Sequence, residues 1–131
     1  MRAGWVRVLS GCAALISVGL IAVAPSASAA TATAQGLKLA VQGQDNASVV
    51  RLRCDPPRGS HPNAAGACDA LAAAGGDFNK LTGRPDTLCP AIFDPVTARA
   101  RGEYRGAPLD FERTYPNRCD LDRQTAPVFQ L

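Results

Sequence analysis

The sequence has few of the side chains that carry catalysis or bind metals. Its one histidine, His61, stands in a Gly-Ser-His-Pro segment, where we expect a loop with a solvated imidazole. A Ser-His-Asp hydrolase needs a histidine that a carboxylate aims at a nucleophile, and such a loop does not supply it. No two cysteines are spaced as Cys-x-x-Cys, whereas zinc sites in small domains need closely spaced ligands. We therefore expect no enzyme, no metal site and no other cofactor.

Paired catalytic carboxylates and phosphate-binding loops are also missing. Asp110 and Glu112 alternate with Leu109 and Phe111. In a strand this alternation places both carboxylates on the face opposite the apolar pair, so we expect them on a solvated surface and not in a glycosidase site. The glycine pair at 75–76 follows a predicted helix, whereas a phosphate-binding loop precedes one.

The expected mature chain lacks an excess of either charge. The N-terminus has Arg2 and Arg7, an apolar run over residues 8–24 and the small-residue pattern Ala27-Ser28-Ala29. This is the pattern of a secretory signal peptide over residues 1–29. Without it, 12 basic residues stand against 11 acidic ones. Near-neutrality argues against nucleic acid or an anionic membrane as the partner, and we expect a secreted, extracellular protein without a membrane anchor.

The cysteines that remain after this cleavage indicate disulfides. About 100 residues suffice for one domain with a modest core, which covalent cross-links would help to stabilise. We expect residues 30–36 to be a flexible mature N-terminus and residues 37–131 to be that domain. Its four cysteines, Cys54, Cys68, Cys89 and Cys119, predict two disulfides, and the residues alone leave three pairings open.

Alternation of apolar and polar residues predicts two hairpins. Residues 37–42 and 48–54 flank a turn signal, and residues 97–103 and 109–115 flank a turn at 105–108. These segments favour an α+β fold with an antiparallel sheet.

The residues between the hairpins predict one helix. Residues 67–74 have high helix propensity and end at two glycines, and Asp77 is placed to cap a further turn. Residues 55–66, rich in proline and glycine, are expected to form a loop, and residues 116–119 a short polar turn.

The most distinctive segment is an apolar stretch that proline restricts on both sides. It reads Leu88-Cys89-Pro90-Ala91-Ile92-Phe93-Asp94-Pro95. Each proline fixes its own φ and pushes the preceding residue toward extended geometry, which predicts a stiff, extended chain. Exposed loops are usually polar and mobile, so a rigid apolar one suggests a segment that a partner holds. The structural alternative is a strand–turn junction that a disulfide ties to the core.

Several motifs together resemble the Streptomyces subtilisin inhibitor-like proteins. They are Gly66-Ala67-Cys68, then Gly75-Gly76-Asp77-Phe78-Asn79, residues 88–96, Phe111-Glu112-Arg113, Asn117-Arg118-Cys119 and Val128-Phe129. The resemblance extends from about Val49 to Leu131. It implies a secreted inhibitor of subtilisin-type serine proteases with a five-stranded antiparallel sheet, two short helices and a homodimeric assembly. It also implies disulfides Cys54–Cys68 and Cys89–Cys119.

The resemblance assigns roles within the proline-bounded segment. The reactive bond would lie between Ala91 and Ile92, with Leu88, Cys89, Pro90, Phe93, Asp94 and Pro95 forming the protease-contact loop. Asn117 would support that loop. Family members often carry a long side chain before the reactive bond, whereas this chain has Ala91, which argues against trypsin-like targets.

Two functions of other classes are weighed beside inhibition. A small secreted enzyme would need His61 or a carboxylate pair at its centre. A non-inhibitory adhesion or binding module would use the face of the sheet, and its function would not depend on Ala91.

Overall fold

The alternating segments pair into one antiparallel sheet in the computed structural model, which describes residues 36–131. The strands are β1 (Leu37–Gln42), β2 (Ala47–Arg53), β3 (Arg58–Gly59), β4 (Val96–Tyr104) and β5 (Ala107–Tyr115). They lie in the order β3-β2-β1-β4-β5. Both predicted hairpins form, and pairing of β1 with β4 joins them into one sheet. The predicted α+β class with a five-stranded antiparallel sheet is confirmed. The predicted signal peptide lies outside the described residues.

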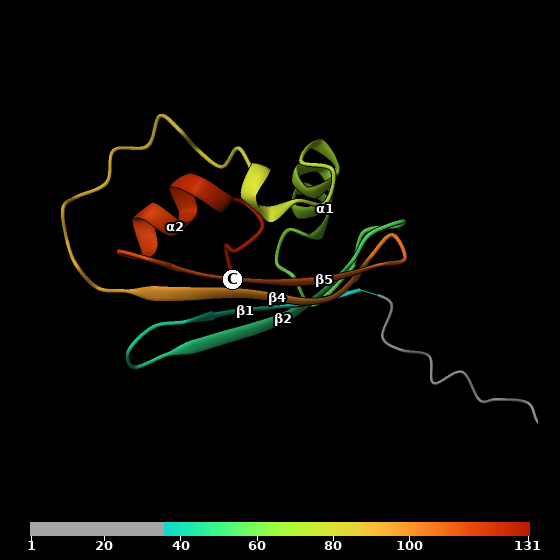
Figure 1. Ribbon diagram of the computed structural model, residues 1–131, viewed down its shortest axis with the longest axis horizontal. Coiled ribbons are helices and arrows are strands. Elements are labelled where there is room, and N and C mark those ends of the chain that lie inside the picture. The colour runs from blue at the N-terminus through green and yellow to red at the C-terminus, as the bar shows by residue number, and fades with distance from the viewer. Residues whose placement is uncertain (1–35) are drawn as a thin grey trace, which may run out of the picture.

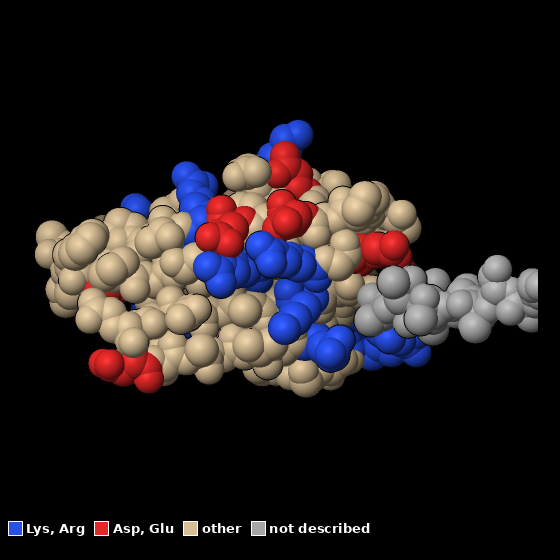
Figure 2. All heavy atoms as spheres, turned by 60° about the horizontal axis from the view of Figure 1, so that its bottom comes forward, with Lys and Arg blue, Asp and Glu red and all other residues tan. Residues whose placement is uncertain are grey.

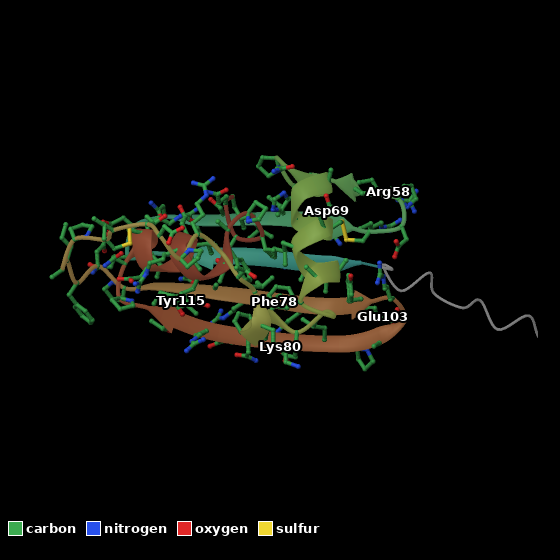
Figure 3. The ribbon with its side chains drawn as sticks, turned by 90° about the horizontal axis from the view of Figure 1, so that it is seen from above. Arg58, Asp69, Phe78, Lys80, Glu103 and Tyr115 are labelled. Atoms are coloured by element: carbon green, nitrogen blue, oxygen red, sulfur yellow. A yellow bond between two sulfur atoms is a disulfide. The ribbon has the colours of Figure 1, made fainter. Side chains whose placement is uncertain are left out.

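Two α-helices and one 3-10 helix cover a single face of this sheet (Figure 1). They are α1 (Ala64–Ala73), η1 (Phe78–Lys80) and α2 (Arg118–Thr125). Helix α1 crosses the strands when the molecule is viewed from above (Figure 3). It begins earlier than residue 67 because the side chain of Asn63 accepts a hydrogen bond from the N–H of Gly66 and caps the helix. Asp77 caps η1, as predicted.

The second helix confirms the two helices that the family resemblance implies, whereas the residues alone predict only a short polar turn at 116–119. Helix α2 begins there, and only Leu121 and Thr125 of its residues are buried, so its sequence shows no wide apolar stripe. The overlooked signal is the spacing of Asn117 and Asp120. Asn117 is the N-cap, and its Oδ1 accepts a hydrogen bond of 2.9 Å from the N–H of Asp120.

The second hairpin is longer than predicted. Its turn consists of Arg105 and Gly106 alone, with φ of +49° and +80°, and Tyr104 pairs with Ala107 across it. Positive φ at both central residues is typical of tight hairpin turns. Pro108 therefore lies within β5, where its missing N–H is tolerated because β5 is an edge strand.

The loop at residues 55–63 is also more ordered than its composition predicts. It contains β3, and the disulfide Cys54–Cys68 joins its start to α1. The expectation of a solvated His61 is wrong, since this side chain is 6% exposed. Its Nδ1 accepts the N–H of Asn63 at 3.0 Å, so its Nε2–H donates to the carbonyl oxygen of Val128 at 2.9 Å. The histidine ties this loop to the C-terminal segment.

The core lies between the sheet and the helices. Its fully buried large side chains include Leu39 of β1, Leu71 of α1, Leu121 of α2 and Phe129. Phe78 lies over the strands (Figure 3), and its ring centroid is 5.1 Å from that of Phe111 and 5.6 Å from that of Phe129. These contacts tie η1 and the C-terminal segment to the inner face of β5.

The outer face of the sheet is charged. Lys38, Arg51, Arg99 and Arg101 lie on it, and Figure 2 shows lysine and arginine gathered in a band with acidic residues alongside. The carboxylates Asp110 and Glu112 are on this solvated face, as predicted, and form ion pairs with Arg101 and Arg99 at 3.2 and 2.7 Å. Within residues 36–131, none of the helices has the length and hydropathy needed to cross a bilayer.

Candidate functional site

The candidate site is the long connection between η1 and β4, which runs along the outside of α2 (Figure 1). Its apolar side chains face solvent: Leu88 is 96% exposed, Phe93 82% and Ile92 58%. Ala91 between them is also exposed. Several large apolar side chains exposed on one loop are typical of a site for a protein partner.

A disulfide anchors this loop just before its most exposed part. Cys89 is joined to Cys119 in the first turn of α2, with their Cα atoms 5.6 Å apart. The pairing is the one that the family resemblance implies, and Cys54–Cys68 is the other. The disulfide holds the chain two residues before Ala91, so Pro90 and Ala91 project from a fixed point.

Hydrogen bonds anchor the loop just after Ala91. The Nδ2 of Asn117 donates to the carbonyl oxygen of Ile92 at 2.8 Å, and the N–H of Asp94 donates to the carbonyl oxygen of Pro116 at 2.8 Å. Asn117 is only 6% exposed, so water competes little for its amide. The segment from Cys89 to Asp94 is thus attached to the N-terminal end of α2 on both sides of Ala91.

A third attachment holds the start of the loop and was not predicted. The N–H of Arg84 donates to the carbonyl oxygen of Arg123 in the last turn of α2 at 2.7 Å. The preceding Gly83 has a φ of +63°, and a Cβ there would lie 2.2 Å from the same carbonyl oxygen. Only glycine fits this close approach, and a glycine between polar residues gives no sequence signal that separates it from an ordinary turn.

The backbone at Ala91 differs from the predicted extended chain. The N–H of Ile92 donates to the carbonyl oxygen of Pro90 at 2.8 Å, which closes a three-residue turn with Ala91 at its apex. The side chain of Ala91 therefore projects from the loop. The ring of Pro90 fixes the φ of that residue, so the chain that enters the turn is restrained as well.

The site contains no catalytic machinery among the described residues. The loop carries no histidine, both ring nitrogens of His61 are engaged elsewhere, and the four cysteines at 54, 68, 89 and 119 are oxidised. Within residues 36–131, no group of three His, Cys, Asp or Glu side chains is placed to hold a metal ion. The arrangement can present a peptide, and the loop holds neither a histidine nor a free thiol that could attack one.

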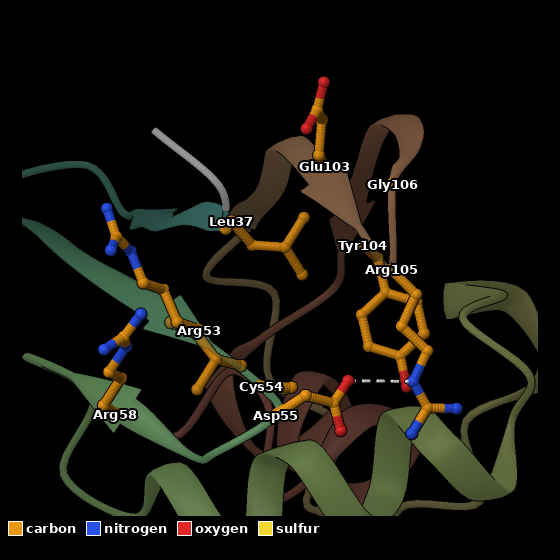
Figure 4. A pocket seen from close by; sticks show the side chains of 11 residues that line it. Leu37, Arg53, Cys54, Asp55, Arg58, Glu103, Tyr104, Arg105 and Gly106 are labelled. Carbon is orange, nitrogen blue, oxygen red and sulfur yellow. Dashed lines mark hydrogen bonds and ion pairs between the residues drawn. The ribbon is translucent and has the colours of Figure 1, made fainter. Parts of the chain in front are cut away.

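A hollow of about 270 Å³ lies at the other end of the sheet, near the β4–β5 turn (Figure 4). The Nε of Arg105 and the Oδ2 of Asp55 form an ion pair of 3.1 Å beside it. None of the predicted protease-contact residues lines this hollow. The loop and the hollow are therefore separate features.

Comparison with known proteins identifies the fold and the family. Residues 24–117 match the subtilisin inhibitor-like family. The chain is 42% identical over 81 residues to a subtilisin inhibitor of Streptomyces albogriseolus, which covers 61% of this chain and 56% of that protein. It is 39% identical over 110 residues to the protease inhibitor SIL-V5 of Streptomyces luteoverticillatus, which covers 82% of this chain and 99% of that protein.

A solved structure agrees with this assignment. The crystal structure of Streptomyces caespitosus sermetstatin in complex with Bacillus licheniformis subtilisin superposes with a TM-score of 0.59 at 31% identity. The match covers 73% of this chain and 97% of sermetstatin. The shared fold and the sequence match over most of the domain lead to one conclusion: this chain belongs to the subtilisin inhibitor-like family.

Proposed function

We propose that this protein inhibits subtilisin-type serine proteases with residues 88–95 as a substrate-like loop and Ala91–Ile92 as its reactive bond. The observation that carries the proposal is the pair of anchors around this bond. The disulfide of Cys89 lies on one side, and the hydrogen bond between Asn117 and the carbonyl oxygen of Ile92 lies on the other. Family membership and the subtilisin complex of sermetstatin support the choice of partner.

Binding would follow from the exposed, anchored position of the loop, in which the turn at Ala91 would open to an extended form on docking. A protease binds an extended peptide by main-chain hydrogen bonds and reads its side chains in pockets. Ala91 would enter the primary pocket, Leu88 a more distant apolar pocket, and Ile92 and Phe93 the leaving-group side. Because the loop is anchored before docking, little conformational entropy is lost. An interface of about 1,600 Å² in total is usual for protease–inhibitor pairs.

Inhibition would result from the fate of the cleaved bond. The protease serine attacks the carbonyl carbon of Ala91, and the amine of Ile92 leaves as an acyl-enzyme forms. In an ordinary substrate this amine diffuses away. Here the Cys89–Cys119 disulfide holds the acyl side and Asn117 holds the carbonyl of Ile92. The amine stays at high effective concentration and re-forms the peptide bond.

The experiment that tests this function is a titration of a panel of serine proteases with the purified mature protein. Subtilisin should be inhibited near equimolar ratio and trypsin should not, since Ala91 offers no cation to a trypsin pocket. Mass spectrometry after prolonged incubation should detect cleavage between Ala91 and Ile92. A non-inhibitory binding module would leave subtilisin active and would not depend on Ala91.

The location and processing of the chain belong to the same proposal. Residues 1–29 would act as a secretory signal, residues 30–36 would lead into the domain, and residues 37–131 would form the extracellular inhibitor. Two disulfides in a small domain support an oxidising compartment. Mass spectrometry of the protein from culture medium would give the new N-terminus, and a mass retaining Met1 would contradict the proposal.

We also propose a homodimer that forms through the outer face of the sheet. Val49, 54% exposed, pairs with Ala40 near the centre of that face. Lys38 of β1 and Arg51 of β2 lie to one side, and Asp110 and Glu112 of β5, which already pair with arginines of β4, lie to the other. A two-fold axis along the strands would bring opposite charges together. Sedimentation should give twice the chain mass for the parent and the chain mass for Val49→Asp, while a monomeric parent would refute the dimer alone.

A further inference from the structure

The support that Asn117 gives to the loop depends on which way its side-chain amide points. Only the Nδ2 end can donate to the carbonyl oxygen of Ile92, and the other end of the amide is an acceptor. A flipped amide would place two oxygens against each other and would push the loop away. Something must therefore hold the amide in one orientation.

Asp120 holds it from two directions. The N–H of Asp120 donates to the Oδ1 of Asn117 at 2.9 Å, and the Oδ2 of Asp120 accepts from the Nδ2 of Asn117 at 3.0 Å. The backbone group can only donate and the carboxylate can only accept, so both bonds select the same orientation of the amide. The Nδ2 then donates once to Asp120 and once to Ile92.

Arg123 in turn holds Asp120. Its Nη2 donates to the Oδ1 of Asp120 at 2.6 Å, while the other carboxylate oxygen faces Asn117. The side chain of Asp120 is 15% exposed, so this charge-assisted bond is partly shielded from water. Each carboxylate oxygen has one partner, which fixes the plane of the carboxylate. The result is a continuous relay from Arg123 through Asp120 and Asn117 to Ile92.

We propose that Asp120 and Arg123 are positioning residues that hold the Asn117 donor on Ile92 and so determine how well the inhibitor resists cleavage. This inference rests on the proposed function. The carbonyl oxygen that accepts the hydrogen bond from Asn117 belongs to Ile92, and cleavage releases the amine of that same residue. A relay that holds this carbonyl holds the amine beside the acyl-enzyme, where it can re-form the bond.

The test measures the inhibition constant for subtilisin and the rate of cleavage at Ala91–Ile92. Asp120→Ala should raise both about tenfold, since it removes a hydrogen bond between a charged group and the amide. Arg123→Ala should raise both by about threefold, and Arg123→Lys should restore most of the difference by returning a cation to Asp120. Asp122→Ala is the matched control, because Asp122 lies on the same helix and pairs with Arg118 instead.

A double-mutant cycle separates positioning from general weakening of the helix. If Asp120 acts through Asn117, then Asp120→Ala should change neither constant further in an Asn117→Ala background. A full tenfold effect in that background would overturn the relay. Asp120→Asn, which keeps the shape and one acceptor oxygen, should fall between the parent and Asp120→Ala and serves where the alanine variant does not fold.

A measurement without protease keeps the relay distinct from the proposed function. Nitrogen-15 relaxation of the free protein should give lower order parameters for the amides of Ile92 and Phe93 in Asp120→Ala than in the parent or in Asp122→Ala. Unchanged order at both amides would overturn the relay. If the parent failed to inhibit subtilisin while the order still fell in Asp120→Ala, the inhibitory function would be wrong and the relay would stand.

Discussion

The Cα of Gly83 lies so close to Arg123 that a Cβ there would be 2.2 Å from the carbonyl oxygen of Arg123. The loop is therefore packed directly on the last turn of α2 at its start, as it is bonded to the first turn at Cys89 and Ile92. One short helix serves as the base for the whole exposed segment. Substitutions in either the loop or the helix should consequently change the position or the mobility of the backbone at Ala91.

Gly83→Ala should lower the free energy of unfolding and speed cleavage at Ala91–Ile92. The matched control is Gly75→Ala, because Gly75 has a similar φ of +62° but has no atoms within 4 Å of the place that a new methyl group would occupy. The free energy of unfolding of the control should fall by only about 1 kcal/mol, which is the cost of a positive φ for alanine. The free energy of unfolding of Gly83→Ala should fall further, because the backbone carbonyl of Arg123 must move to make room for the methyl group. Equal losses in chemical denaturation would contradict the close packing.

Replacing both Cys89 and Cys119 with serine should convert the inhibitor into a substrate. Loss of a native disulfide typically costs about 2–5 kcal/mol of stability, and here it also frees the chain beside the reactive bond. The matched control is the serine pair at Cys54 and Cys68, which should lose stability but keep slow cleavage, since that disulfide lies away from the loop. If the variant with serine at positions 89 and 119 bound subtilisin as tightly as the parent, the disulfide would not preorganise the loop for binding.

Ala91 should determine which protease is inhibited. A methyl group fills little of a deep apolar pocket, so Ala91→Leu or Ala91→Met should tighten subtilisin binding by about 1–2 kcal/mol. Ala91→Lys should create trypsin inhibition by offering an ammonium to a pocket carboxylate.

All three Ala91 variants should unfold at temperatures close to that of the parent, because Ala91 is exposed and outside the core. Inhibition constants for subtilisin and trypsin measure the effect. An Ala91→Lys variant without activity toward trypsin, together with no cut after residue 91, would show that the reactive bond lies elsewhere.

Stability at alkaline pH should depend on Tyr115. Burial raises the pKa of its hydroxyl above the ordinary 10.0, and nearby Arg113 offsets part of that increase. Since the fold favours the neutral phenol, this contribution is complete below the ordinary pKa and is lost as the pH rises through the raised one. Tyr115→Phe should therefore lose less unfolding free energy than the parent between about pH 9 and pH 12. Parallel pH profiles would contradict this assignment.

Sequence periodicity determined most of the sheet. Alternation predicted residues 37–42 as a strand, which are the bounds of β1, because Leu37, Leu39 and Val41 are buried on one face. It also predicted both hairpins. The predicted turn at residues 105–108 is wider than the observed turn, which consists of Arg105 and Gly106. Pairing of Tyr104 with Ala107 and of Glu103 with Pro108 extends both strands toward the turn. The sequence of this segment does not show whether these residues pair or form a longer loop.

The helix that supports the loop could not be predicted from periodicity. Helix α2 buries only Leu121 and Thr125, and its stability comes from capping by Asn117 and from packing against the sheet. His61 illustrates the same limit, since its neighbours suggest an exposed loop, whereas its partner Val128 is 67 residues away. Local sequence carries no information on a partner so distant in the chain.

The sequence by itself determined the composition of the exposed segment: an apolar stretch with Ala91 at its centre and prolines on either side. Local sterics suffice for that, because proline acts on its own residue and the one before it. Only the tertiary structure decided how the segment is held, by Asn117, Arg123 and a disulfide across 30 residues. These attachments join groups that are far apart in the chain, so they exist only after the sheet and α2 have brought them together.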